Sequence, residues 1–291
     1  MQIEFKNLTK AYGAKKALNN FSLTLEANKI YGLLGRNGAG KTTMMQLLAG
    51  QISPTSGEVL VNGEKPFNNR TVLEDICLIN ESNNFKRRLK IKHVLKIASL
   101  FYPKWSQETA DRLMKTFKLE SNLNMKGLSK GMESSVGIII GLASRANITI
   151  FDEPYIGLDA SARYDFYDAL LEEFQQHPRT IILSTHLIDE VSNLFEEIIL
   201  VREGELMHHK TSEEMTELSI QVTGPKDKVD AFCTGKNVIH TDEIMGRKTV
   251  IVFGEHFQLE DLKNEGLEAE RCPIQKLMVH LTEEKGVRTH V

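Results

Sequence analysis

The sequence is poor in cysteine and has no long apolar run. The three cysteines among 291 residues, Cys77, Cys233 and Cys272, are widely spaced and form no CxxC pair. This spacing argues against a disulfide framework or a thiolate metal site. The most apolar run, Val136 to Ala143, contains two glycines and is far shorter than the roughly 20 residues that cross a bilayer. A membrane process would therefore need another chain for its membrane part.

A basic surplus is also missing. The chain has 36 lysines and arginines against 39 acidic residues, a formal net charge of −3. This balance argues against a protein that binds nucleic acid through a broad basic surface, so we expect no nucleic-acid partner. The first residues lack the basic start and apolar stretch of a signal peptide, and we expect a cytoplasmic protein.

Apolar runs and helical patterns alternate along much of the chain. Between the strand-like runs the apolar residues recur at helical spacing, which predicts an α/β domain with a mostly parallel sheet covered on both faces. The predicted strands are Ser22–Leu25, Ile30–Leu34, Val59–Val61, Ile76–Ile79, Ile148–Phe151, Thr180–Leu183 and Ile198–Val201. Asn62-Gly63 after the third of them predicts a hairpin turn.

Two helical stretches and a second, smaller domain complete the predicted organisation. From about residue 86 to 145 the pattern is helical, with Ile91, Val94, Leu95, Ala98 and Phe101 on one face and Ser106 as a later N-cap. A second predicted helix has the apolar residues Tyr164, Tyr167, Leu170, Leu171 and Phe174. We predict a first domain over residues 1–215 and a small α+β domain over 216–291.

A phosphate-binding loop follows the predicted strand Ile30–Leu34. Residues Gly35 to Thr42 fit G-x-x-x-x-G-K-[ST] and stand between this apolar run and an apolar helix. Its glycines let successive N–H groups face phosphate oxygens, and the helix N-terminus adds partial positive charge. We predict that Lys41 reaches the β- and γ-phosphates and that Thr42 ligates Mg²⁺. The nucleotide-binding residues are Gly35, Arg36, Asn37, Gly38, Ala39, Gly40, Lys41, Thr42 and Thr43.

Two acidic residues directly follow the strand-like run Ile148–Phe151. Asp152 and Glu153 would lie at the carboxyl end of a parallel strand, where such sheets bind ligands. We interpret Asp152 as a Mg²⁺ ligand and Glu153 as the residue that polarises the attacking water. An Asp-Glu pair alone would more often be a solvated turn; the phosphate loop earlier in the chain favours the catalytic interpretation.

The remaining motifs carry a resemblance to a known family. Leu128-Ser129-Lys130-Gly131-Met132 resembles the signature of ABC ATPases, usually LSGGQ. Further on, Gly157-Leu158-Asp159 resembles the family's D-loop and Ser184-Thr185-His186 its switch histidine. Tyr12 stands where the family places the aromatic residue that stacks on adenine. All of these landmarks occur in family order between about residues 1 and 210.

The resemblance implies a fold and a mechanism. It implies a P-loop NTPase of ABC type, with an antiparallel part at the N-terminus and a helical insertion. It also implies an ATPase that forms a homodimer or heterodimer, in which ATP and Mg²⁺ lie between the phosphate loop of one subunit and Ser129, Lys130 and Gly131 of the other. His186 would contact the γ-phosphate, and Asp159 would line the dimer interface. Lys41, Glu153 and His186 are the implied catalytic residues.

The same resemblance implies a partner. Such a subunit drives a separate membrane permease and is held by it at the inner face of the cell membrane. The form Leu-Ser-Lys-Gly-Met resembles a bacterial branch linked to ABC-2 type permeases, often exporters. The region after residue 81 docks the permease in this family, and here it carries Lys86, Arg87, Arg88, Lys90, Lys92 and Lys96. It would contact an acidic patch or anionic head groups, or be a solvated helix face.

Two departures from the family pattern stand out. Lys130 and Met132 replace the usual Gly and Gln of the signature. Lys130 could attract the partner's γ-phosphate, but we favour the interpretation that it points to solvent. Glu81 stands where the family has a glutamine, and its carboxylate can still ligate Mg²⁺ as a hard oxygen donor.

Two other functional classes compete with the transporter ATPase. An ATP-gated regulatory module with little hydrolysis would not need both Glu153 and His186. ABC proteins of translation carry two ATPase units in one chain, and those of DNA repair carry long coiled-coil insertions. This sequence has neither feature.

The Glu81 departure makes a testable prediction. A second carboxylate near the γ-phosphate should strengthen the dependence on Mg²⁺ and alter coupling to the permease. Titrating Mg²⁺ against ATP turnover for Glu81→Gln checks this, and an unchanged activity and Mg²⁺ profile would refute it.

Overall fold

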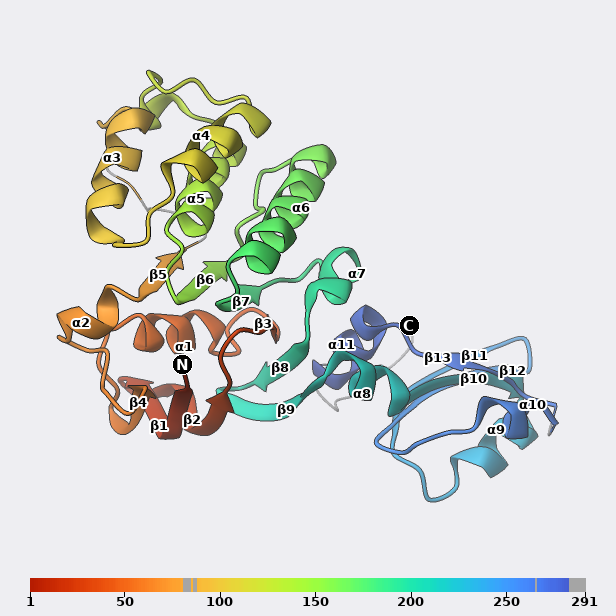
Figure 1. Ribbon diagram of the computed structural model, residues 1–291. Helices are drawn as coiled ribbons and strands as arrows, with labels where there is room; N and C mark the ends of the chain where they lie inside the picture. Colours follow the sequence, from red (N-terminus) through yellow and green to blue (C-terminus); the bar gives the residue numbers. More distant parts are fainter. Residues whose placement is uncertain (81–84, 86–87, 265, 283–291) are drawn as a thin grey trace. The chain divides into compact units, whose positions relative to one another are not determined.

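The computed structural model describes residues 1–80, 85, 88–264 and 266–282. The chain divides into two compact units, shown in Figure 1. The first comprises Met1–His186 and Leu194–His209, and the second comprises Leu187–Asn193 and Lys210–Val291. The boundary predicted from the sequence lies between residues 215 and 216.

A six-stranded sheet forms the centre of the first unit. Its strand order is β5-β6-β7-β3-β8-β9, and the pairs from β5 through β8 are parallel. Three of its strands are buried along their whole length, as expected when helices cover both faces. The predicted parallel sheet is confirmed. Its strands are β3 (Ile30–Leu34), β5 (Ile76–Ile79), β6 (Ile148–Asp152), β7 (Thr180–Ser184), β8 (Glu197–Arg202) and β9 (Glu205–Thr211).

A separate antiparallel sheet lies at the N-terminus. It consists of β1 (Ile3–Tyr12), β2 (Lys15–Leu25) and β4 (Ser56–Val61), with β1 in the middle. Phe5 and Phe21 pack edge to face in its core, with ring centroids 5.8 Å apart. The predicted turn at Asn62-Gly63 has positive φ angles at both residues, but the only pairing after it is an isolated bridge between Val61 and Glu64, so β4 ends there.

The helical insertion comprises α3 to α5, which Figure 1 shows grouped together. Ser106 caps α4 as predicted, since its hydroxyl accepts a hydrogen bond from the Thr109 amide at 3.2 Å. The helices of the first unit are α1 (Lys41–Leu48), α2 (Arg70–Leu73), α3 (Ile91–Phe101), α4 (Gln107–Thr116), the 3₁₀ turn η1 (Met125–Gly127), α5 (Lys130–Ala143) and α6 (Ala160–Gln176).

Two predicted core residues are exposed instead. Phe101 is the last residue of α3 and is 68% exposed, although the rest of its predicted face is buried. Tyr164 is 58% exposed because α6 buries the face that contains Phe166 and Leu170. Residues two positions apart on a helix lie on nearly opposite sides, so Tyr164 cannot share that face with Phe166.

A buried carboxylate joins the insertion to α6. Glu173 of α6 is 1% exposed and accepts hydrogen bonds from three side chains: Thr109 at 2.8 Å, Arg112 at 3.1 Å and Arg145 at 3.3 Å. Thr109 and Arg112 belong to α4, and Arg145 follows α5. The charge is therefore satisfied only while these three elements stay packed.

The second unit is an α+β arrangement around a four-stranded antiparallel sheet of order β11-β12-β10-β13. Its core includes Ile220, Val222, Val250 and Val252. β11 and β13 were not predicted, because they are mostly polar and partly exposed. The elements are α7 (Ile188–Val191), η2 (Ser192–Leu194), α8 (Ser212–Glu217), β10 (Ser219–Pro225), α9 (Lys226–Cys233), β11 (Val238–Ile244), β12 (Arg247–Phe253), α10 (Leu259–Asn264), β13 (Glu268–Arg271) and α11 (Ile274–Thr282).

In the part of the chain that the structure describes, every helix is too short or too polar to traverse a bilayer.

The Glu173 cluster generates a stability prediction. Glu173→Ala leaves buried donors and cationic groups without their shared acceptor, and we expect it to destabilise the first unit by about 3 kcal/mol. The chain's single tryptophan, Trp105, lies two residues before α4 and reports on this region in urea unfolding followed by fluorescence.

A matched control is Glu172→Ala. Its side chain is 49% exposed and pairs with the same Arg112, so its loss should cost less than about 1 kcal/mol. Equal effects of the two substitutions would contradict the assignment of the buried cluster as the joint between α4 and α6.

Candidate nucleotide site

The predicted phosphate loop joins β3 to α1. Gly40, which precedes the helix, has φ +109, and a Cβ there would lie 2.5 Å from the Ala17 carbonyl oxygen. Only glycine satisfies both constraints. The first turn of α1 has no acidic residue, and Gly40 has no capping side chain. The positive end of α1 is therefore left for an anion.

Lys41 is the first residue of α1 and is only 8% exposed. Its ammonium donates a hydrogen bond to the Gly35 carbonyl oxygen at 2.6 Å, within the loop itself. Burial lowers the pKa of Lys41, while the negative charges of Glu153 and Asp152 oppose that shift. The lysine is thus a cation held in a partly desolvated site beside two carboxylates.

Asp152 ends β6 and meets the phosphate loop across the sheet. Its Oδ2 accepts a hydrogen bond from the Thr42 hydroxyl at 2.8 Å. A hydroxyl and a carboxylate are hard oxygen donors, the kind that Mg²⁺ accepts, usually with water and phosphate as its other ligands. The donor set therefore fits this ion.

Glu153 has φ +50, a left-handed conformation that is unfavourable for a residue other than glycine. Its Oε2 lies 2.7 Å from Nδ1 of His186. An ionised carboxylate only accepts hydrogen bonds, so Nδ1 carries the hydrogen and Nε2 of His186 faces elsewhere. The two predicted catalytic residues are in direct contact.

Lys41, Thr42, Asp152 and Glu153 line a cavity of about 410 Å³. Gly35 and Ala39 belong to the loop but do not line it; the Ala39 carbonyl accepts a hydrogen bond from the Gly204 amide at 2.9 Å. The lining residues are Tyr12, Lys15, Ala17, Arg36, Asn37, Gly38, Gly40, Lys41, Thr42, Thr43, Asp152 and Glu153.

Two of the lining residues were missed by sequence reasoning. Lys15 and Ala17 lie on β2, where Lys15 pairs with Tyr12 in the antiparallel register. No motif marks them, and only the pairing of β1 with β2 could have indicated them. Tyr12 lines the cavity and is 51% exposed, with the Lys10 ammonium over its ring at 5.1 Å from the centroid.

The signature residues and Asp159 do not line this cavity. Ser129 caps α5, accepting a hydrogen bond from the Met132 amide at 3.2 Å, and Lys130 is exposed. A Cβ on Gly131 would lie 2.3 Å from the Gly157 carbonyl oxygen. Asp159 caps α6 by accepting from the Ala162 amide at 2.8 Å. Within one chain the predicted site residues therefore form two groups, those that line the cavity and those at the starts of α5 and α6.

Three of the residues singled out in the sequence, Glu81, Lys86 and Arg87, lie outside the described residues. A different residue with no predicted role, Tyr155, contacts both Glu153 and His186 through its hydroxyl.

Comparison with known proteins decides the family. Residues 18–156 match the family described as ABC transporter. The chain is 32% identical to the lantibiotic transport ATP-binding protein SrtF of Streptococcus pyogenes, over 74% of this chain and 95% of that protein. This chain belongs to the ABC transporter ATP-binding proteins. It binds and hydrolyses ATP, and the predicted ABC ATPase is confirmed.

The chain is also similar to an export protein and to a solved structure. The chain is 28% identical to the Nod factor export ATP-binding protein I of Burkholderia lata, over 79% of this chain and 81% of that protein. A dimeric ATP-binding cassette solved after hydrolysis with ADP and Pi has the same fold, with a TM-score of 0.65. It is 24% identical and covers 72% of this chain and 98% of its own.

Proposed function

We propose that this ATPase works as a dimer with composite sites, in which each nucleotide lies between the phosphate loop of one subunit and the signature of the other. The observation that carries the proposal is the division of the site residues. Lys41, Thr42, Asp152 and Glu153 line one cavity, and Ser129 begins a helix away from it. The similar cassette bound to ADP and Pi is itself a dimer.

The chemistry of each half follows from its groups. The positive end of α1 and Lys41 hold the β- and γ-phosphates. Thr42 and Asp152 would hold Mg²⁺, which supplies charge neutralisation at the phosphate oxygens. The start of α5, capped by Ser129 and with Gly131 packed on the turn at Gly157, offers a second positive helix end to the γ-phosphate.

Glu153 is the proposed general base. Its carboxylate polarises the water that attacks the γ-phosphate. Nδ1 of His186 lies 2.7 Å from Oε2 of Glu153, which leaves the other ring nitrogen, Nε2, to contact the γ-phosphate. Asp159 would lie at the dimer interface, where its capping of α6 keeps the turn in place. The relatives give no support to the alternative of a regulatory module with little hydrolysis.

We further propose that the chain powers a separate permease of the ABC-2 type, working in export at the inner face of the membrane. The Leu-Ser-Lys-Gly-Met signature and the relative named for Nod factor export support this. The dimer would consist of two copies of this chain or of this chain and a related one.

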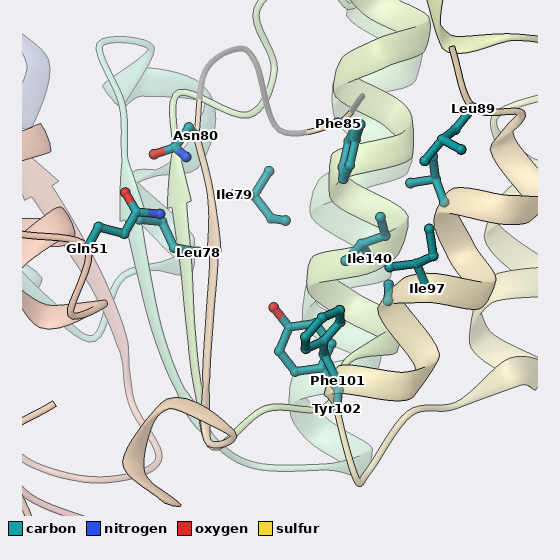
Figure 2. Close-up of a pocket in the computed structure, with 12 residues that line it drawn as sticks. Gln51, Leu78, Ile79, Asn80, Phe85, Leu89, Ile97, Phe101, Tyr102 and Ile140 are labelled. Atoms are coloured by element: carbon teal, nitrogen blue, oxygen red, sulfur yellow. The ribbon is translucent and has the colours of Figure 1, made fainter. Parts of the chain in front are cut away.

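A second cavity of the first unit is the proposed permease contact. It has a volume of about 500 Å³, and Figure 2 shows side chains converging on it from β5, α3 and α5, among them Ile79, Ile97 and Ile140. Leu100 and Phe101, both exposed, end α3, and Phe101 lines the cavity. Arg88, Lys92 and Lys96 are exposed on or before this helix. An apolar segment with acidic flanks would match this surface.

The base assignment makes a kinetic prediction. Glu153→Gln should lower ATP turnover at least about 100-fold, because a general base contributes roughly that much or more. ATP binding should survive, so the variant should form an ATP-dependent dimer in size-exclusion chromatography with light scattering. Lys41→Ala is the control that loses ATP binding and the dimer together. Turnover retained by Glu153→Gln would overturn the assignment.

The docking proposal makes a separate prediction. Replacing Leu100 and Phe101 together by serine should reduce recovery of a polytopic membrane subunit from detergent extracts at least tenfold, because it removes exposed apolar area. Basal ATPase activity should stay within twofold. The control is Phe67→Ser, which is also exposed, at 43%, but does not line the cavity. Undiminished recovery would count against this surface.

A further inference from the structure

Tyr155 belongs to none of the motifs but lies inside the proposed catalytic centre. It stands two residues after Glu153, in the turn between β6 and α6, and is 3% exposed. Its ring packs edge to face on the imidazole of His186, with centroids 5.6 Å apart. A buried tyrosine needs partners for its hydroxyl, and here those partners are the catalytic groups themselves.

The hydroxyl of Tyr155 joins both residues. It donates a hydrogen bond to Oε2 of Glu153, and it accepts one from the backbone amide of His186 at 2.9 Å. The Thr185 hydroxyl lies 2.6 Å away and completes the environment. Nδ1 of His186 reaches the same Oε2. Tyr155 thus fixes one carboxylate oxygen and the start of the histidine segment at once.

The other oxygen of Glu153 is left for a different partner. Within the described residues both hydrogen bonds of this carboxylate end on Oε2. Oε1 is then the atom that can accept from a water, and Glu153 lines the nucleotide cavity. A carboxylate held at one oxygen and open at the other has a defined direction, which a general base requires.

The phenol stays a donor under working conditions. Burial, with the negative charge of Glu153 adding to it, raises the pKa of Tyr155 well above its usual range. A protonated phenol against a carboxylate is a charge-assisted hydrogen bond, which is stronger than a neutral one.

We propose that Tyr155 is a positioning residue for ATP hydrolysis: its hydroxyl anchors Oε2 of Glu153 and the backbone of His186, so that Oε1 is directed at the attacking water. This rests on the proposed role of Glu153 as general base. Tyr155 itself neither touches the nucleotide cavity as a lining residue nor exchanges a proton.

The test is Tyr155→Phe, which keeps the ring and its contact with His186 but removes the hydroxyl. We expect kcat to fall about tenfold or more, while KM for ATP and the equilibrium affinity for ATP stay within twofold. A residue that only supports packing would change affinity or thermal stability along with kcat. Tyr167→Phe is the control, since Tyr167 is also buried, at 4% exposure, but lies on α6. Its kinetics should match the parent protein.

A double variant separates this inference from the role of Glu153. If Tyr155 acts through Glu153, Tyr155→Phe should not slow Glu153→Gln further. A further loss by the same factor, or full or increased turnover of Tyr155→Phe alone, would overturn the inference while leaving the base assignment intact. Full turnover of Glu153→Gln would instead overturn the base assignment, and the inference with it.

A second substitution covers the case in which Tyr155→Phe folds poorly. Difluorotyrosine at position 155 keeps the shape of the side chain but loses its proton at a lower pH. Burial raises the pKa of this analogue as well, so turnover and the absorbance of the phenol are followed together as the pH rises. Turnover should fall as the phenol of the variant ionises, and turnover that persists after this ionisation would overturn the proposal.

Discussion

The carboxyl edge of the parallel sheet is the constraint on which the site depends. β3 and β6 are both neighbours of β7, so the phosphate loop after β3 and the acids at the end of β6 meet at one edge. The hydrogen bond between Thr42 and Asp152 joins residues 110 positions apart. Without that strand order, the nucleotide groups would not share a cavity.

The turn from Glu153 to Asp159 connects the two groups of site residues. At its start Tyr155 contacts Glu153, and near its end Gly157 packs directly on Gly131. The Ser134 hydroxyl donates to the Ile156 carbonyl at 2.7 Å. A short stretch of backbone therefore joins α5, which Ser129 caps, to Glu153, the proposed general base.

The predictions from sequence succeeded where the signal is local. Ile30–Leu34 and Ile76–Ile79 form strands with the predicted bounds, because continuous apolar runs next to turns have few other solutions. They failed where burial is decided by the neighbours of a helix. Phe101 and Tyr164 have apolar bodies at plausible helical spacing, yet both are exposed. The polar strands β11 and β13 had no apolar pattern to reveal them, since pairing with β12 and β10 creates them.

The sequence by itself determined the phosphate loop, the acids, the signature and hence the family, because each of these is a short motif whose chemistry is carried by adjacent residues. Only the tertiary structure decided which side chains complete the site. Lys15 lies at the cavity because β2 pairs with β1, and Tyr155 contacts His186 because the ends of β6 and β7 lie side by side. Contacts between residues that are far apart in the sequence depend on strand order and on side-chain direction. A short sequence motif specifies neither of these.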